Sequence, residues 1–129
     1  MNVVNRSALS VRPTQAFVDW INQLEATEGE DDLLLEDVER ESTIYLIGEM
    51  DSEEAIHAYL RARYLDILEN ELRAWEEDVR LWPETLDWAL FEDFLQIEFS
   101  YLALDLEEDQ PLSVQSIDSD DLLLDFEQE

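Results

Sequence analysis

The 129-residue sequence contains no cysteine, two glycines and one histidine. Without cysteine the chain forms neither disulfides nor thiolate metal sites, and it offers no thiol nucleophile. Its glycines, Gly29 and Gly48, are too few for a glycine-rich phosphate loop of either familiar kind. A single histidine, His57, limits acid–base chemistry at neutral pH. We therefore identify no catalytic residue and expect a protein that is not an enzyme.

Long apolar runs are also missing. No stretch is long enough to span a bilayer, and the N-terminal segment MNVVNRSALSVRP lacks the continuous apolar region of a signal peptide. Together with the lack of cysteine, this predicts a cytoplasmic protein that does not bind membranes.

Acidic residues dominate the charged positions. Asp and Glu total 35 against seven basic residues, which gives a formal net charge of −28. Such a charge repels nucleic acid and anionic membranes and attracts basic proteins. It also permits imitation of a phosphate array, so a nucleic-acid mimic is one version of this prediction. The alternative is that the acids reflect solubility or the bias of a genome and have no specific partner.

The hydrophobic pattern indicates one α+β domain over residues 1–106, with three main helices and a minor two-stranded sheet. Residues 107–129 form an acidic tail that we expect to be flexible or docked. The clearest strand is Thr43–Ile47, a β-branched and aromatic run closed by glycine. Residues 8–12 are its best partner within the chain, and a strand from a second subunit, which would give a homodimer, is the alternative.

The helices are expected at four places. Thr14 is a suitable N-cap for the first, which ends near Leu24, and a short helix follows over 33–41. A third helix, capped by Asp51 or Ser52, runs to about residue 78. The fourth and most apolar spans Pro83 to Leu106 and would pack against the third as a helical hairpin.

A line of carboxylates separates two apolar stripes on this fourth helix when residues are placed at 100° steps. We call Asp87, Glu98 and Asp105 the carboxylate seam. The seam marks the edge of an interface, pairs with arginines, or reaches a gap in the packing. In a cleft, its carboxylates would have raised pKa values.

The tail ends in an apolar cluster set among acids. This cluster consists of Leu122, Leu123, Leu124 and Phe126. Acids interleaved with bulky apolar residues are typical of segments that fold onto a basic-rimmed groove of a partner. The cluster would equally suit a last strand or turn that docks on the domain itself.

Three segments together resemble a known family. They are RPTQAFVDW at 12–20, the strand Thr43–Ile47 with Glu49, and the corner Leu81–Pro83. Over residues 8–106 the chain resembles a family of short, acidic, uncharacterised bacterial proteins. The resemblance implies a bacterial, cytoplasmic, single-domain protein, and it brings no activity, cofactor or site residue.

One metal motif occurs. Glu54 and His57 form Glu-x-x-His, which puts two ligands on one face of a helix. Di-iron bundles need this motif twice and two further glutamates, so a dimer with Glu92 or Glu98 as bridging ligands would be required. A chance match in so acidic a sequence is the simpler interpretation, and we expect no cofactor.

The sequence thus predicts a non-enzymatic protein-interaction module that binds a basic protein. A carboxylate-based or metal-dependent enzyme is the first alternative. A homo-oligomeric soluble protein whose charge has no specific partner is the second.

Overall fold

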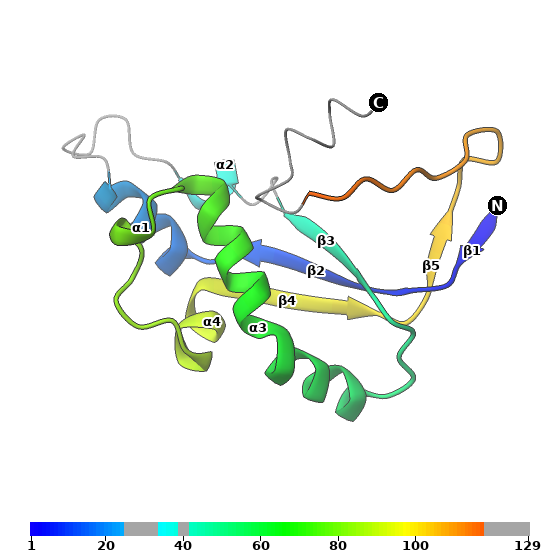
Figure 1. The fold of residues 1–129 in the computed structure, drawn as a ribbon, viewed down its shortest axis with the longest axis horizontal. Helices are drawn as coiled ribbons and strands as arrows, with labels where there is room; N and C mark the ends of the chain where they lie inside the picture. Colours follow the sequence, from blue (N-terminus) through cyan, green and yellow to red (C-terminus); the bar gives the residue numbers. More distant parts are fainter. Residues whose placement is uncertain (25–33, 39–41, 118–129) are drawn as a thin grey trace.

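The computed structural model describes residues 1–24, 34–38 and 42–117, and these form helices packed against a small antiparallel sheet (Figure 1). The α+β class predicted from the sequence is confirmed. In chain order the elements are β1 (Asn2–Val4), β2 (Ser7–Pro13), α1 (Gln15–Leu24), α2 (Leu35–Val38), β3 (Thr43–Ile47), α3 (Glu53–Trp75), a 3₁₀ turn (Val79–Leu81), α4 (Trp88–Phe94), β4 (Leu95–Ser100) and β5 (Ala103–Asp105).

The main sheet has three antiparallel strands in the order β3-β2-β4, while β1 and β5 pair separately as a two-stranded ribbon. β2 is the central strand because its pattern alternates: Leu9 and Val11 are fully buried on one face, and Ser10 between them is half-buried on the other. Ser10 lies opposite Ile44 of β3 and Glu98 of β4. The predicted pairing of residues 8–12 with Thr43–Ile47 is therefore confirmed within one chain.

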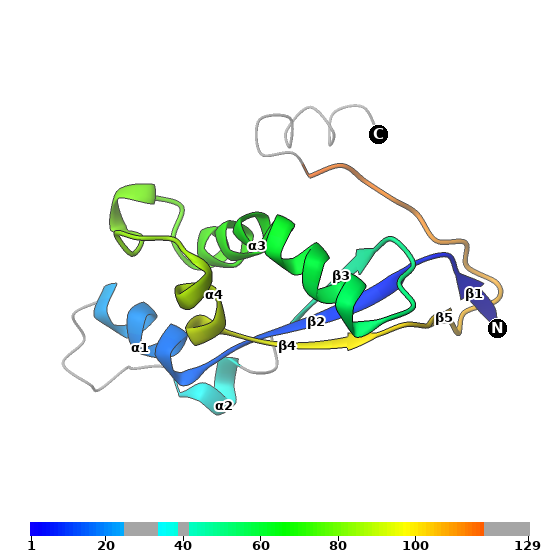
Figure 2. The ribbon, with the colours of Figure 1, turned by 90° about the horizontal axis from the view of Figure 1, so that it is seen from below.

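α3 covers one face of this sheet, and α2 lies on the other side (Figure 2). Ser52 is the N-cap of α3, because its hydroxyl accepts a hydrogen bond from the N–H of Ala55 at 3.1 Å. The negative charges of Glu53 and Glu54 in the first turn interact favourably with the positive end of the helix dipole. The predicted cap and helix are confirmed, although the helix ends at Trp75 rather than near residue 78.

The predicted helix from Pro83 to Leu106 is wrong. Asp87 caps the short helix α4, whose chain turns to extended conformation at Leu95 and continues as β4. Over 95–100 apolar residues alternate with Gln, Glu and Ser, which suits a strand with one face against α3. β4 forms backbone hydrogen bonds with the side of β2 that does not pair with β3. If α4 continued as a helix, the N–H and C=O groups on that side of β2 would lack these partners. The helical hairpin is consequently reduced to contacts between α3 and α4.

Two smaller predictions also change. Thr14 precedes α1, but its hydroxyl donates to the carbonyl of Asp93 and its N–H donates to the carbonyl of Phe94 at 2.9 Å. It therefore ties α1 to the end of α4. Of the helix predicted over 33–41, α2 covers only Leu35–Val38, and the residues on either side of 34–38 lie outside the described part.

Aromatic rings fill the core where α1, α4 and the sheet meet. The Phe17 ring lies 5.5 Å from that of Trp20 and 5.3 Å from that of Phe94, both at edge-to-face angles. Trp82 is also buried, and its indole N–H donates to the carbonyl of Glu76 at 2.7 Å. The ring contacts join α1 to α4, and the Trp82 hydrogen bond ties the residue after the 3₁₀ turn to the end of α3.

Ser7 is a buried polar residue that joins three segments. Its hydroxyl donates to the carbonyl of Tyr101 at 3.0 Å and accepts from the N–H of Met50 at 2.9 Å. We expect Ser7→Ala to lower the free energy of unfolding by about 1–3 kcal/mol, because two part-buried backbone groups lose their hydrogen-bond partner. Urea denaturation measures this. Ser10→Ala, on the opposite face of β2, is the control, and an equal loss in both variants would contradict the assignment.

Candidate functional site: a groove beside β4

β4 lies at an open edge of the main sheet (Figure 1). Among the described residues it pairs only with β2, so alternate residues of β4 point their N–H and C=O groups away from the sheet. Such an edge is a template for another extended segment. The free edge is six residues long, from Leu95 to Ser100.

A groove of about 620 Å³ runs between this edge and the first turns of α3. Its floor is apolar: Ile56 is 2% exposed, and Leu60 lies one turn further along the same helix. Ile97 and Phe99 of β4 form the opposite wall, and Phe99 is 39% exposed. We call this feature the α3–β4 groove.

The lip of the α3–β4 groove is acidic. Glu53 and Glu54 line it, both are exposed, and no ion pair is found for either within residues 1–24, 34–38 and 42–117. Arg61, seven residues after Glu54 on α3, lies over the Trp88 ring, with its guanidinium 4.4 Å from the ring centre. The groove therefore combines apolar side-chain sites with uncompensated negative charge.

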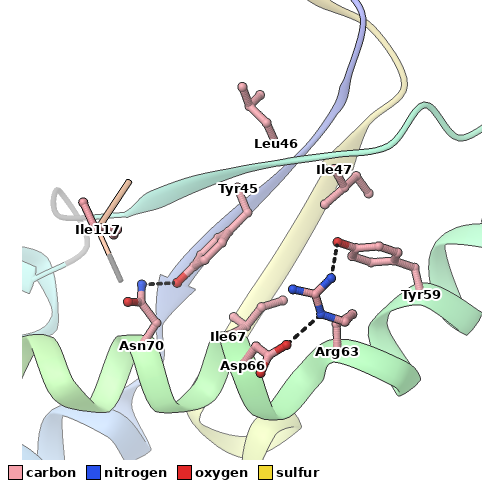
Figure 3. A pocket seen from close by; sticks show the side chains of 9 residues that line it. All are labelled: Tyr45, Leu46, Ile47, Tyr59, Arg63, Asp66, Ile67, Asn70 and Ile117. Atoms are coloured by element: carbon pink, nitrogen blue, oxygen red, sulfur yellow. Dashed lines mark hydrogen bonds and ion pairs between the residues drawn. The ribbon is translucent and has the colours of Figure 1, made fainter. Parts of the chain in front are cut away.

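A second hollow, of about 610 Å³, lies between β3 and α3 (Figure 3). Its polar groups bind one another: Arg63 donates to Asp66 at 2.7 Å, and Asn70 donates to the Tyr45 hydroxyl at 2.8 Å. Ile117 of the C-terminal segment also lines it. This mutual pairing suits a structural role.

Beneath this hollow, Tyr45 of β3 donates a hydrogen bond to the carboxylate of Glu71, which is only 9% exposed. Burial raises the pKa of Glu71, and the hydrogen bonds from Tyr45, Thr43 and Asn70 offset part of that rise. Burial, reinforced by Glu71, raises the pKa of Tyr45. The pair holds β3 against α3 at the cost of a buried carboxylate.

The structure does not bring the carboxylate seam together. Asp87 caps α4, Glu98 lies on β4, and Asp105 lies on β5, so no helix face carries all three. The seam as a line on one helix is wrong because that helix ends at Phe94. Glu98 forms an ion pair with Arg12 of the neighbouring strand, which confirms arginine pairing for this one member.

Glu54 and His57 both line the α3–β4 groove. The His57 ring packs edge-on against Trp88 at 5.8 Å. No group of three or more His, Asp or Glu side chains placed to hold a metal occurs in the described part of the chain. Within the described residues, Glu54 and His57 therefore have no third metal ligand beside them. Both side chains form part of the groove wall. The tail cluster Leu122, Leu123, Leu124 and Phe126 lies outside the described residues.

None of the family models, curated proteins or solved structures compared with this chain matches it. The resemblance to acidic bacterial proteins therefore stays a prediction, and the function is argued from the site. Across the described residues, no helix combines the length and apolar character needed to cross a bilayer.

Proposed function

We propose that this protein is a non-enzymatic interaction module that binds a basic partner protein. The observation that carries the proposal is the α3–β4 groove, an apolar groove with an acidic lip beside a free strand edge, in a chain of net charge −28. Interfaces gain most of their affinity from a few buried apolar anchors, while complementary charge adds rate and specificity. The groove offers both.

The arginines do little to neutralise the acidic surface. Arg12, Arg63 and Arg80 each pair with one carboxylate. Arg61 and Arg73 lie over the rings of Trp88 and Trp82. With 35 acidic residues against seven basic ones, acidic side chains remain in large excess and can attract a basic surface.

The biological setting follows from the same features. We place the protein in the bacterial cytoplasm on the basis of its resemblance and its lack of cysteine. A partner that itself binds nucleic acid would present the required basic surface, and this protein would then act as a nucleic-acid mimic. Competition between this protein and DNA for the partner tests that version.

Salt-dependent capture of basic proteins tests the proposed function. Full-length protein on beads is incubated with bacterial lysate at about 50 mM NaCl and washed at about 500 mM, where screening is strong. We expect retained proteins to be markedly more basic than the lysate average and to be released by salt. Retention of proteins with average charge, or retention that salt does not alter, would contradict the proposal.

A full-length variant with serine at all four apolar positions of the tail cluster separates the tail from the domain. It keeps every acidic residue of the tail. Unchanged capture of basic proteins by this variant would place binding on the domain. Loss of capture would place it on Leu122, Leu123, Leu124 and Phe126.

A further inference from the structure

We propose that the partner supplies an extended segment that adds to the free edge of β4 as a fourth strand. Apolar side chains of this segment enter the α3–β4 groove, and its lysines or arginines contact Glu53 and Glu54. This inference rests on the proposed function and specifies its binding surface and the chemistry of the partner. The segment is one in which apolar and basic residues alternate.

The geometry of β4 favours strand addition. Side chains along a strand alternate between the two faces of its sheet, and an added strand repeats the alternation of its neighbour. Ile97 and Phe99 are on the face of β4 that lines the groove, while Glu98 pairs with Arg12. Every second side chain of an added strand would therefore lie over the apolar floor made by Ile56 and Leu60. Backbone hydrogen bonds to the edge would supply affinity, and the groove would select the side chains.

The acidic lip of the groove favours a basic segment over a second copy of the chain or its own tail. A second copy of the chain carries the same net charge of −28, and the tail cluster of this chain lies among Asp118, Asp120, Asp121 and Asp125. Either would bring carboxylates onto the acidic lip and be repelled. A basic segment has the opposite effect, because lysine and arginine extend their apolar stems along the groove and keep their charges near Glu53 and Glu54.

The other edge of the sheet suits such a segment less well. The hollow beside β3 already contains Arg63, and Ile117 of the same chain contributes to its lining. The most exposed apolar residues of β3, Ile44 and Leu46, are 59% and 55% exposed. Leu46 lies on the opposite side of β3 from Tyr45 and from α3 (Figure 3). Ile44 of β3 therefore provides an exposed apolar control position outside the lining of the α3–β4 groove.

The test measures binding of a fluorescent octapeptide of alternating lysine and valine to the full-length protein by fluorescence anisotropy. Phe99→Arg replaces an apolar groove wall with a charge that repels the peptide, and Ile44→Arg makes the same charge change on β3. We expect Phe99→Arg to weaken binding by about tenfold or more and Ile44→Arg by less than about threefold. Circular dichroism confirms that each variant is folded.

A charge-matched pair of variants tests the acidic lip. Glu53→Gln with Glu54→Gln removes the same charge as Glu107→Gln with Asp109→Asn, which are exposed residues of the C-terminal segment. We expect the first double variant to weaken binding by about threefold to tenfold more than the second. Equal effects would show that net charge alone attracts the peptide, which would overturn the groove assignment.

A peptide with proline at its centre tests strand addition, because proline lacks the N–H that a strand donates. We expect this peptide to bind at least about tenfold more weakly than its parent. Equal affinity of the two peptides, or no binding of the parent peptide, would overturn strand addition. A wild-type dimer whose mass is halved by Phe99→Arg would do so too, since the edge would then hold a second copy. In each case capture of basic proteins from lysate decides separately whether the proposed function stands.

Discussion

Replacing Phe17 with alanine is expected to lower the free energy of unfolding by about 3–5 kcal/mol, the usual range for a buried phenylalanine. The side chain is 1% exposed and touches the rings of Trp20 and Phe94 at centroid distances of 5.5 and 5.3 Å. It therefore joins α1 to the end of α4, and its loss leaves a cavity in the core. Since single domains have about 5–15 kcal/mol of stability in total, the variant should be close to unfolding at 37 °C.

Urea denaturation followed by circular dichroism measures this loss. Phe99→Ala is the matched control, because it removes the same ring from a position that is 39% exposed. We expect the control to cost less than about half as much, since the truncation removes less buried area and leaves no enclosed cavity. Comparable losses in the two variants would show that Phe17 is not central to the packing.

Tyr45→Phe is expected to destabilise the protein in a pH-dependent way. The Tyr45 hydroxyl donates to the buried carboxylate of Glu71, and hydrogen bonds to charged groups contribute about 1.5–3 kcal/mol. We expect a loss of about 2–3 kcal/mol near pH 7 that falls toward about 1 kcal/mol as the pH is lowered, because the hydrogen bond from Tyr45 becomes a neutral one when the carboxylate binds a proton. Denaturation from pH 7 down to about pH 5, above the pI of 4.1, measures the trend.

The raised pKa of Glu71 determines how the stability of the protein changes with pH. Burial raises this pKa above its ordinary value, so the stability linked to Glu71 is fullest at low pH and is lost as the pH rises through the raised value. Removing the Tyr45 hydroxyl raises the pKa further and enlarges the loss at neutral pH. Tyr59→Phe is the control, because its hydroxyl accepts only a 3.4 Å hydrogen bond from Arg63 at the surface. An effect of Tyr45→Phe that grows on acidification would contradict this account.

Much of the fold was predictable because its local signals agree with one another. Thr43–Ile47 is a β-branched run ending in glycine, and β3 has these same bounds. Ser52 followed by two glutamates marks the start of α3. Residues 8–12 were predicted as the strand that pairs with Thr43–Ile47, and β2 does so, but as the central strand of three rather than as one of two.

The segment 95–100 was mispredicted because a short apolar run fits both periodicities. Leu95, Ile97 and Phe99 occupy apolar stripes at 100° steps and also alternate strictly with polar residues. The choice depends on β2, whose second edge needs a partner. The alternation was the signal that could have revealed β4.

The prediction of the carboxylate seam was wrong because it depended on a long helix that the structure does not contain. Asp87 and Asp105 lie on separate elements, and only tertiary structure brings Arg12 to Glu98. The groove could not be predicted as a site, because Ile56 and Phe99 are brought together by packing of a helix over a strand more than 40 residues away along the chain.

The negative charge of the chain also affects which segments can pair with the free edge of β4. An unpaired strand edge promotes association between identical chains. With a charge of −28 on each copy, such association is opposed by repulsion, whereas a basic segment is attracted to the same edge. The same charge would thus protect the edge and select its partner.

Backbone amide chemical shifts of isotope-labelled full-length protein, recorded during titration with the lysine–valine peptide, test the central claim most directly. We expect the largest changes along Leu95–Ser100 and the first turns of α3 around Ile56, with slower hydrogen exchange for the outward-pointing amides of β4. Changes confined to the tail or to β3, or spread evenly over acidic residues without slower exchange on β4, would contradict it.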